Sequence, residues 1–246
     1  MSLASLPMYD RPETAAANDR FWQAIRNRLG EGPDTLTRTG ELWDHWLSPD
    51  LLLSQTCGYP YRAKLHGRVT LVGTPDYGLP GCPSGHYRSV FVARTDDPRA
   101  TPADFAEAPF AYNEPLSQSG WAAPQNHAAA HGFTFTNTIQ TGGHVLSARA
   151  VAEGKADIAA LDALTWALIQ RHDPFATTLR EIARTEPTPV LPYITALTRD
   201  PEPLFDAISA AIADLSPDDR DTLSLRGLVR IPPDAYLAIP NPPPPG

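Results

Sequence analysis

The stretch from Tyr112 to Gly132 constrains the fold most, because it must change from strand to helix within a few residues. The segment PFAYNE, residues 109–114, leads into this stretch; it is short and ends in turn-forming residues. Pro124 then fixes where a helix can begin, since proline lacks an N–H group and fits only in the first turn. The sequence therefore predicts a strand, a polar turn, and a helix that starts near Ser119 or Gly120 and ends at Gly132.

Hydroxyl and amide donors gather at this predicted helix start. Ser117 and Ser119 supply hydroxyls, and Gly120 lets another group approach the backbone closely. A helix start also leaves its first N–H groups without intrahelical partners and carries a partial positive charge, so we expect the amides from Ser119 to Ala122 to be open. Such a place suits an anion, for example phosphate or carboxylate. An ordinary serine N-cap is the alternative interpretation of the same residues.

Short strands alternate with helices along the rest of the chain, which predicts an α/β sheet architecture. Strands are expected at residues 3–7, 35–37, 51–55, 69–72, 87–93, 133–136 and 157–161. Helices are expected from Pro12 to Leu29, at 41–47, after Gly142-Gly143-His144, and at 163–171 and 202–215.

Three motifs, in this order along the chain, resemble the phosphate/phosphite/phosphonate periplasmic-binding-protein family, the solute receptors of phosphonate-type ABC importers. They are LLLSQTCGYPY at 51–61, Pro115-x-Ser117-x-Ser119-Gly120, and Gly142-Gly143-His144-x-x-Ser147 followed by ARAVAEGKADIAALD. The resemblance implies a two-lobed, type II clamshell in which each lobe is a mixed sheet flanked by helices. Lobe 1 would comprise residues 1–93 and 186–246, and lobe 2 would be residues 94–185, inserted between two hinge crossings. Residues 241–246 would form a solvated, Pro-rich tail.

The resemblance also implies which residues hold a ligand. Ser117, Ser119, Gly120 and Trp121 would bind an anion through hydroxyls and amides, and His144 would donate a hydrogen bond from the facing helix. In the first lobe, Thr56 and Tyr59 follow a strand end, where ligands of open α/β sheets bind, and Tyr9 is a further candidate. Packing within a turn is the alternative for Tyr59. Asp162 is either a helix N-cap or a partner for an amine on the ligand.

The resulting functional hypothesis is a solute-binding protein of an ABC transporter, or a relative of one, that binds a small oxyanion, phosphonate or phosphate-like, between its lobes. It needs no metal and no cofactor, and an ABC permease is the partner that the family implies. The net charge of −8 argues against a nucleic-acid backbone as ligand. No apolar run reaches about 18 residues, so we expect no membrane insertion.

Two alternatives stay open at this level. The same fold hosts enzymes that resemble chorismate dehydratase or thiamine-pyrimidine synthase, for which Asp162, Glu114 and His144 would be the acid–base candidates, and a ligand sensor is also possible. The opening residues lack a signal peptide, so the chain as read is expected to be cytoplasmic, or periplasmic if the true start lies upstream. Cys57 and Cys82 could form a disulfide or remain thiols.

Overall fold

The computed structural model describes residues 2–246 and divides the chain into two compact units. The first unit comprises Met1–His86 and Pro189–Ala238, and the second comprises Tyr87–Thr188 and Ile239–Gly246. The chain therefore passes between the units three times. Strands β4 (His86–Tyr87) and β10 (Thr188–Pro189) contain the first two passages. The sequence analysis had placed these crossings at 93–94 and 185–186.

The first unit contains a five-stranded mixed sheet with the order β1-β2-β11-β3-β12. Strand β1 is parallel to β2, whereas β11 is antiparallel to both β2 and β3, and β12 is antiparallel to β3. The strands are β1 (Leu3–Ala4), β2 (Leu51–Gln55), β3 (Val69–Asp76), β11 (Tyr193–Ala196) and β12 (Gly227–Val229). Every residue of β2 is buried, as expected for a strand with helices on both faces.

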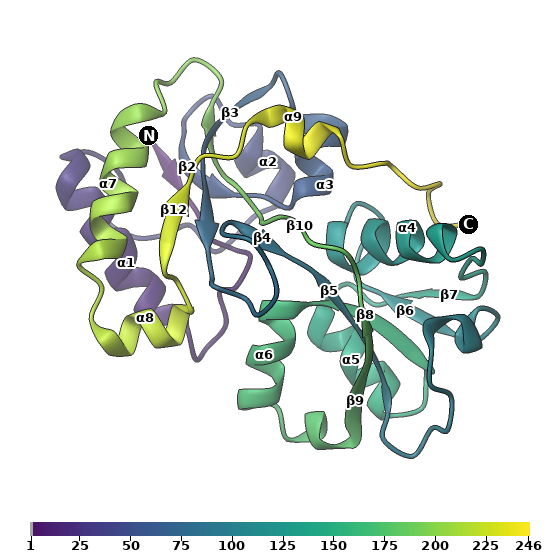
Figure 1. Cartoon of the computed structure of the whole chain (residues 1–246). Coiled ribbons are helices and arrows are strands. Elements are labelled where there is room, and N and C mark those ends of the chain that lie inside the picture. The colour runs from purple at the N-terminus through teal and green to yellow at the C-terminus, as the bar shows by residue number, and fades with distance from the viewer. Residues whose placement is uncertain (1) are drawn as a thin grey trace. The chain divides into compact units, whose positions relative to one another are not determined.

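Helices cover both faces of this sheet (Figure 1). Helix α1 ends where Gly30 adopts a left-handed backbone, as its sequence predicts. On one face lie α1 (Ala15–Leu29), α7 (Glu202–Ala213) and α8 (Pro217–Leu223). On the other lie α2 (Leu42–Trp46), α3 (Gly58–Pro60), the π-helix η1 (Tyr61–Leu65) and α9 (Pro233–Leu237), which bury Trp46, Tyr61 and Tyr236 against the strands.

The second unit has its own five-stranded mixed sheet, with the order β7-β6-β8-β5-β9. Strands β6, β7 and β8 run parallel, and β5 is antiparallel to β8 and β9. The strands are β5 (Ser89–Arg94), β6 (Phe110–Tyr112), β7 (Thr138–Gln140), β8 (Ile158–Asp162) and β9 (Leu179–Arg184). The helices are η2 (Pro102–Phe105), η3 (Gln118–Ala122), α4 (Ala123–Ala130), α5 (His144–Ala152), α6 (Ala163–His172) and η4 (Pro174–Thr178).

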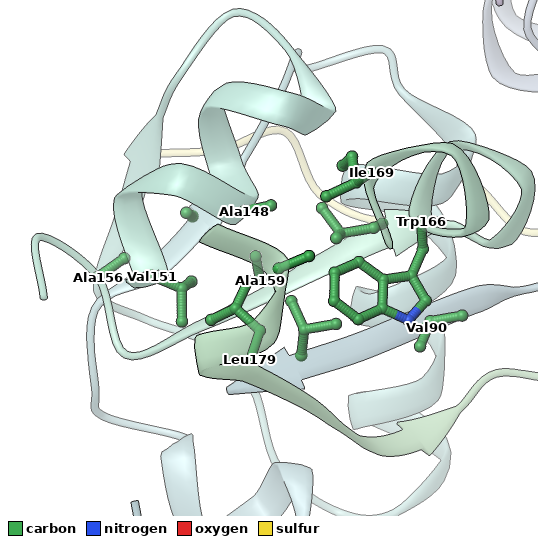
Figure 2. Close-up of a cluster of buried hydrophobic side chains, with 12 residues drawn as sticks. Val90, Ala148, Val151, Ala156, Ala159, Trp166, Ile169 and Leu179 are labelled. Atoms are coloured by element: carbon green, nitrogen blue, oxygen red, sulfur yellow. The ribbon is translucent and has the colours of Figure 1, made fainter. Parts of the chain in front are cut away.

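Alternation along β5 shows how this sheet is covered on both faces. Val90 and Val92 belong to a cluster with residues of α5 and α6, and Figure 2 shows the indole of Trp166 and the side chain of Ile169 beside those of the strands. Phe91 points the opposite way, toward His127 of α4 at a ring-centroid distance of 5.1 Å. The mixed sheets flanked by helices agree with the predicted fold class.

Two predicted strands are wrong. Residues 35–37 form no strand; a single backbone bond joins the Thr37 N–H to the Ala4 carbonyl. Residues 133–136 are also irregular. Phe135 is buried because its ring stacks on that of Phe110, at a centroid distance of 4.4 Å, and not because its backbone pairs in a sheet. The two edge strands of this sheet are β7 and β9, and the sequence analysis predicted neither. Apolar content alone does not distinguish a strand from a buried aromatic loop.

Candidate functional site

Three strands of the second unit end at the same edge of their sheet. Because β6, β7 and β8 are parallel, the residues after Tyr112, the residues after Gln140, and Asp162 share that edge. Strand β5 runs the other way and contributes its first residue, Ser89, which lies opposite Asp162. The carboxyl edge of parallel strands is the usual ligand position in α/β folds.

The predicted anion loop occupies this edge. Residues 118–122 form a π-helix that continues as α4, so the helix starts one residue before the predicted Ser119. Ser117 caps it: its hydroxyl accepts from the Gly120 N–H at 2.9 Å, and its carbonyl accepts from the N–H groups of Trp121 and Ala122. The expectation of four open amides is therefore wrong for these three, because Ser117 satisfies them.

One amide of the loop keeps the predicted character. Within residues 2–246, the backbone N–H of Ser119 has no acceptor. The hydroxyl of the same residue lies 2.8 Å from Nε2 of His144, the first residue of α5. The structure thus brings together two of the residues that the sequence analysis selected, from the starts of two helices.

His144 is electrically neutral at this site. Burial lowers the pKa of its imidazole from 6.5 to about 4, because a charged ring would lose its hydration. Its Nδ1 is sealed from solvent and has no hydrogen-bond partner among the described residues. A neutral imidazole has one donor and one acceptor nitrogen, so Nε2 either donates to the Ser119 hydroxyl or accepts from it.

Gly120 is required by its neighbour Asn113. A Cβ atom at position 120 would lie 1.9 Å from Oδ1 of Asn113, so no side chain fits without a shift of that residue. This Oδ1 atom is buried and has no hydrogen-bond partner within residues 2–246. The same holds for the side-chain hydroxyl of Ser89 at the same edge. The sequence analysis named neither residue, although Asn113 directly follows a strand and could have been selected on that ground.

The other two candidates of the second unit already have partners. Trp121 donates its indole N–H to the Pro243 carbonyl at 3.0 Å and packs on the ring of Tyr112. Asp162 is the N-cap of α6, where its Oδ1 accepts from the N–H groups of Leu164 and Thr165. The capping interpretation of Asp162 therefore describes its observed hydrogen bonds.

The candidates of the first unit are described separately. Tyr9 lines a small pocket together with Asn18, Gln55, Tyr77 and Tyr193, and its ring meets that of Tyr77 edge-on at 5.3 Å. Gln55 donates to the Tyr77 hydroxyl at 3.2 Å, and burial raises the pKa of Tyr193. Leu6, Phe21, Leu223 and Leu225 complete its lining, so the pocket combines phenol and amide groups with apolar side chains. The sequence analysis selected only Tyr9 from it.

Thr56 and Tyr59 lie in the segment that follows β2. The Thr56 N–H donates to the Pro192 carbonyl at 3.1 Å, and its side chain is fully buried. Tyr59 is also buried, with the guanidinium of Arg62 stacked 4.3 Å from its ring centroid. These contacts match the packing interpretation of Tyr59. Cys57, between them, is not joined to Cys82 in a disulfide.

Other site types find no support in the described part of the chain. No group of three or more His, Cys, Asp or Glu side chains within residues 2–246 could hold a metal ion. None of the helices described is both long and apolar enough to cross a bilayer.

The sequence profile of the ABC transporter, phosphonate, periplasmic substrate-binding protein family matches residues 50–233, which include every second-unit candidate. The chain belongs to this family. Phosphonate substrate-binding proteins are also among its structural relatives. PhnD1 of Prochlorococcus marinus in complex with methylphosphonate has a TM-score of 0.71 at 15% identity, covering 96% of this chain and 94% of that one.

Further solved structures share the fold at similarly low identity. A binding protein component of an ABC phosphonate transporter from Pseudomonas aeruginosa has a TM-score of 0.71 at 14% identity, covering 97% of this chain and 84% of its own. MatC of Rhodopseudomonas palustris with bound malate has a TM-score of 0.64 at 14% identity, covering 93% and 89%. These likenesses show the type II periplasmic-binding-protein fold. No curated protein sequence matches the chain.

Proposed function

We propose that this protein binds a small phosphorus oxyanion, phosphonate or phosphate-like, and serves as the substrate-binding component of an ABC importer in the periplasm. The observation that carries the proposal is the pair formed by the Ser119 hydroxyl and His144 Nε2, 2.8 Å apart, beside a Ser119 N–H that has no acceptor among the described residues. Both residues lie in the first turn of a helix, whose positive end favours an anion.

Ser119 is the proposed contact, and His144 orients it. When His144 Nε2 donates to the Ser119 oxygen, the serine hydrogen is free to point at an oxygen of the ligand. The Ser119 N–H can then donate to the same group, so one residue supplies two donors. Because the ring is neutral, the anion is held by hydrogen bonds and helix dipoles, without an ion pair to this histidine.

Buried polar atoms without partners support a ligand at this edge. Oδ1 of Asn113, the Ser89 hydroxyl and His144 Nδ1 are all sealed from solvent in this way. Such atoms are uncommon in native structures, because each costs free energy unless a water or ligand satisfies it. The Asn113 oxygen accepts only, so it suits the remaining O–H of a singly protonated phosphonate, or an amine.

Ser119 and His144 also have the geometry of a nucleophile and its base, which is the specific observation in favour of an enzyme. Two features weigh against catalysis. A histidine with a pKa of about 4 is a weak base near neutral pH, and its Nδ1 has no partner within residues 2–246 that could orient it. We therefore propose a binding site, in which a bound phosphonate is recovered unchanged.

A thermal-shift screen tests the proposed ligand class. The probes are methylphosphonate, 2-aminoethylphosphonate, phosphate, phosphite, sulfate and malate at equal ionic strength. A ligand that binds only the native state stabilises it by about 2.7 kcal/mol at one hundred times its Kd. We expect a rise in Tm with at least one phosphorus oxyanion and none with malate. A rise with malate alone would contradict the proposal.

Asp162 decides the choice among phosphonates in this proposal. Its Oδ1 already accepts two backbone N–H groups. If the amine of the ligand also reaches Asp162, Asp162→Asn should weaken the binding of 2-aminoethylphosphonate more than that of methylphosphonate. Equal loss for both ligands would identify Asp162 as a cap alone.

A further inference from the structure

The Pro-rich segment of residues 239–246 (IPNPPPPG) belongs to the second unit, whereas the sequence analysis expected a solvated tail at 241–246. Figure 1 shows the C-terminal residues beside α4. Pro242 is buried, although it lies in a segment without regular secondary structure. A proline-rich stretch favours the polyproline II conformation, which has no internal hydrogen bonds and leaves every carbonyl available to an external donor.

Two side chains of one continuous helical stretch supply those donors. Nε1 of Trp121 donates to the Pro243 carbonyl at 3.0 Å, and Nδ2 of Asn126 donates to the Pro240 carbonyl at 3.0 Å. The two carbonyls are three residues apart, which is one full turn of polyproline II, so they face the same side of the segment. The buried Pro242 lies between them in sequence.

We propose that Trp121 and Asn126 form a polyproline-II docking site whose occupant is residues 240–243 of this same chain. The geometry is that of proline-rich recognition in general: an aromatic N–H meets a carbonyl while a proline ring packs beside it. At its three prolines, 240, 242 and 243, the occupant needs only donors on the receiving surface, because proline has no N–H of its own. Its stiffness also reduces the entropy lost on docking.

Docking of the segment fixes the anion loop from its far end. Trp121 is adjacent to Gly120 and two residues from Ser119; its ring contacts that of Tyr112, and its indole N–H donates to the segment. The docked segment is thus a positioning element for Ser119. This last consequence rests on the proposed function, whereas the docking itself does not.

Exchange of the Trp121 indole proton with solvent tests the docking directly. The experiment compares the full chain with a variant ending at Ala238 by ¹⁵N-indole NMR, with Trp121→Phe to assign the signal. We expect exchange to be at least ten times faster in the shortened variant, and saturable recovery on adding a peptide of residues 239–246. Trp22 is the internal control, because its indole donates to the Pro33 carbonyl within the first unit and should keep its protection.

The outcomes separate the claims. Equal Trp121 exchange in both proteins, with Trp22 protected, would overturn the docking site. Protection of the full chain that disappears on dilution would show that a second copy supplies the segment, and would overturn the intramolecular occupant.

Calorimetry with methylphosphonate tests the positioning role. We expect the shortened variant to bind at least threefold more weakly than the full chain. Equal affinities would overturn that role. If both proteins bind neither methylphosphonate nor any other phosphorus oxyanion of the thermal-shift screen, with the indole result intact, the proposed function is overturned instead.

Discussion

Gly120 lies so close to Asn113 that there is no room for a side chain at position 120. A Cβ at position 120 would lie 1.9 Å from Asn113 Oδ1, far inside van der Waals contact. The absence of a side chain is therefore needed to keep the loop beside Asn113, and the N–H of the same glycine donates to the Ser117 cap, three residues earlier.

Replacing this glycine with alanine is the first prediction. Gly120→Ala should lower the free energy of unfolding by about 1–3 kcal/mol, the usual cost of forcing atoms into a packed region. It should also weaken methylphosphonate binding, since Asn113 or the loop must move. Urea unfolding and calorimetry measure the two effects. Gly227→Ala in β12 is the matched control, because its Cβ would meet nothing closer than 4.0 Å; equal losses in both variants would refute the steric argument.

Burial of His144 predicts a pH dependence of stability. Its pKa is about 6.5 in the unfolded chain and about 4 in the folded one, so between these values only the unfolded state binds the proton. Stability should therefore fall as the pH is lowered from 6.5 to 4, by on the order of 3 kcal/mol from this residue.

The measurement compares wild type with His144→Asn across that pH range. Burial also lowers the pKa of His127, which contributes in the same direction to both proteins and cancels in the difference. If the difference in unfolding free energy between wild type and His144→Asn stays constant from pH 7 to pH 4, His144 takes up a proton as easily in the folded state as in the unfolded state, which would contradict the prediction.

At the residue scale, the sequence selected Ser119 and His144 from a serine at a helix start and a histidine after two glycines, and the structure places their side chains 2.8 Å apart. The sequence was insufficient for Ser89 and Asn113. Their candidacy depends on buried side-chain oxygens that have no hydrogen-bond partner within residues 2–246, and only three-dimensional packing determines that.

At the scale of elements, the cap of the π-helix is the feature that the structure changed most. The helix start was predicted to offer its amides to a ligand, but Ser117 takes three of them, leaving Ser119 as the open donor. Pro124 lies in the first turn of α4, so it marks the change from π-helix to α-helix and not the helix start at Gln118.

Two serine caps provide a matched pair of variants. Ser117 caps η3 in the second unit, and Ser216 caps α8 in the first, accepting from the Asp219 N–H at 3.1 Å. Removing either hydroxyl should cost about 1 kcal/mol of stability. Only Ser117→Ala should also weaken phosphonate binding. Calorimetry showing the same affinity for both variants would mean that the cap does not shape the site.

At the scale of the whole molecule, alternating strands and helices predicted an α/β sheet, and the family resemblance predicted two mixed sheets flanked by helices. The order of motifs was enough to predict the family, which the match over residues 50–233 establishes. The place of the Pro-rich segment could not be predicted. Polyproline II has no hydrophobic period that marks a partner, and its docking depends on donors more than a hundred residues away in sequence.

The most direct test of the account is the calorimetric affinity of methylphosphonate for wild type, Ser119→Ala and Thr178→Ala. Thr178 is the control because it also loses one hydroxyl, bonded to the Phe175 carbonyl, beside the opposite end of the same sheet. Hydrogen bonds to charged groups contribute about 1.5–3 kcal/mol, so Ser119→Ala should bind roughly 10- to 150-fold more weakly. Thr178→Ala should match wild type. Undiminished affinity in Ser119→Ala would contradict the proposed site.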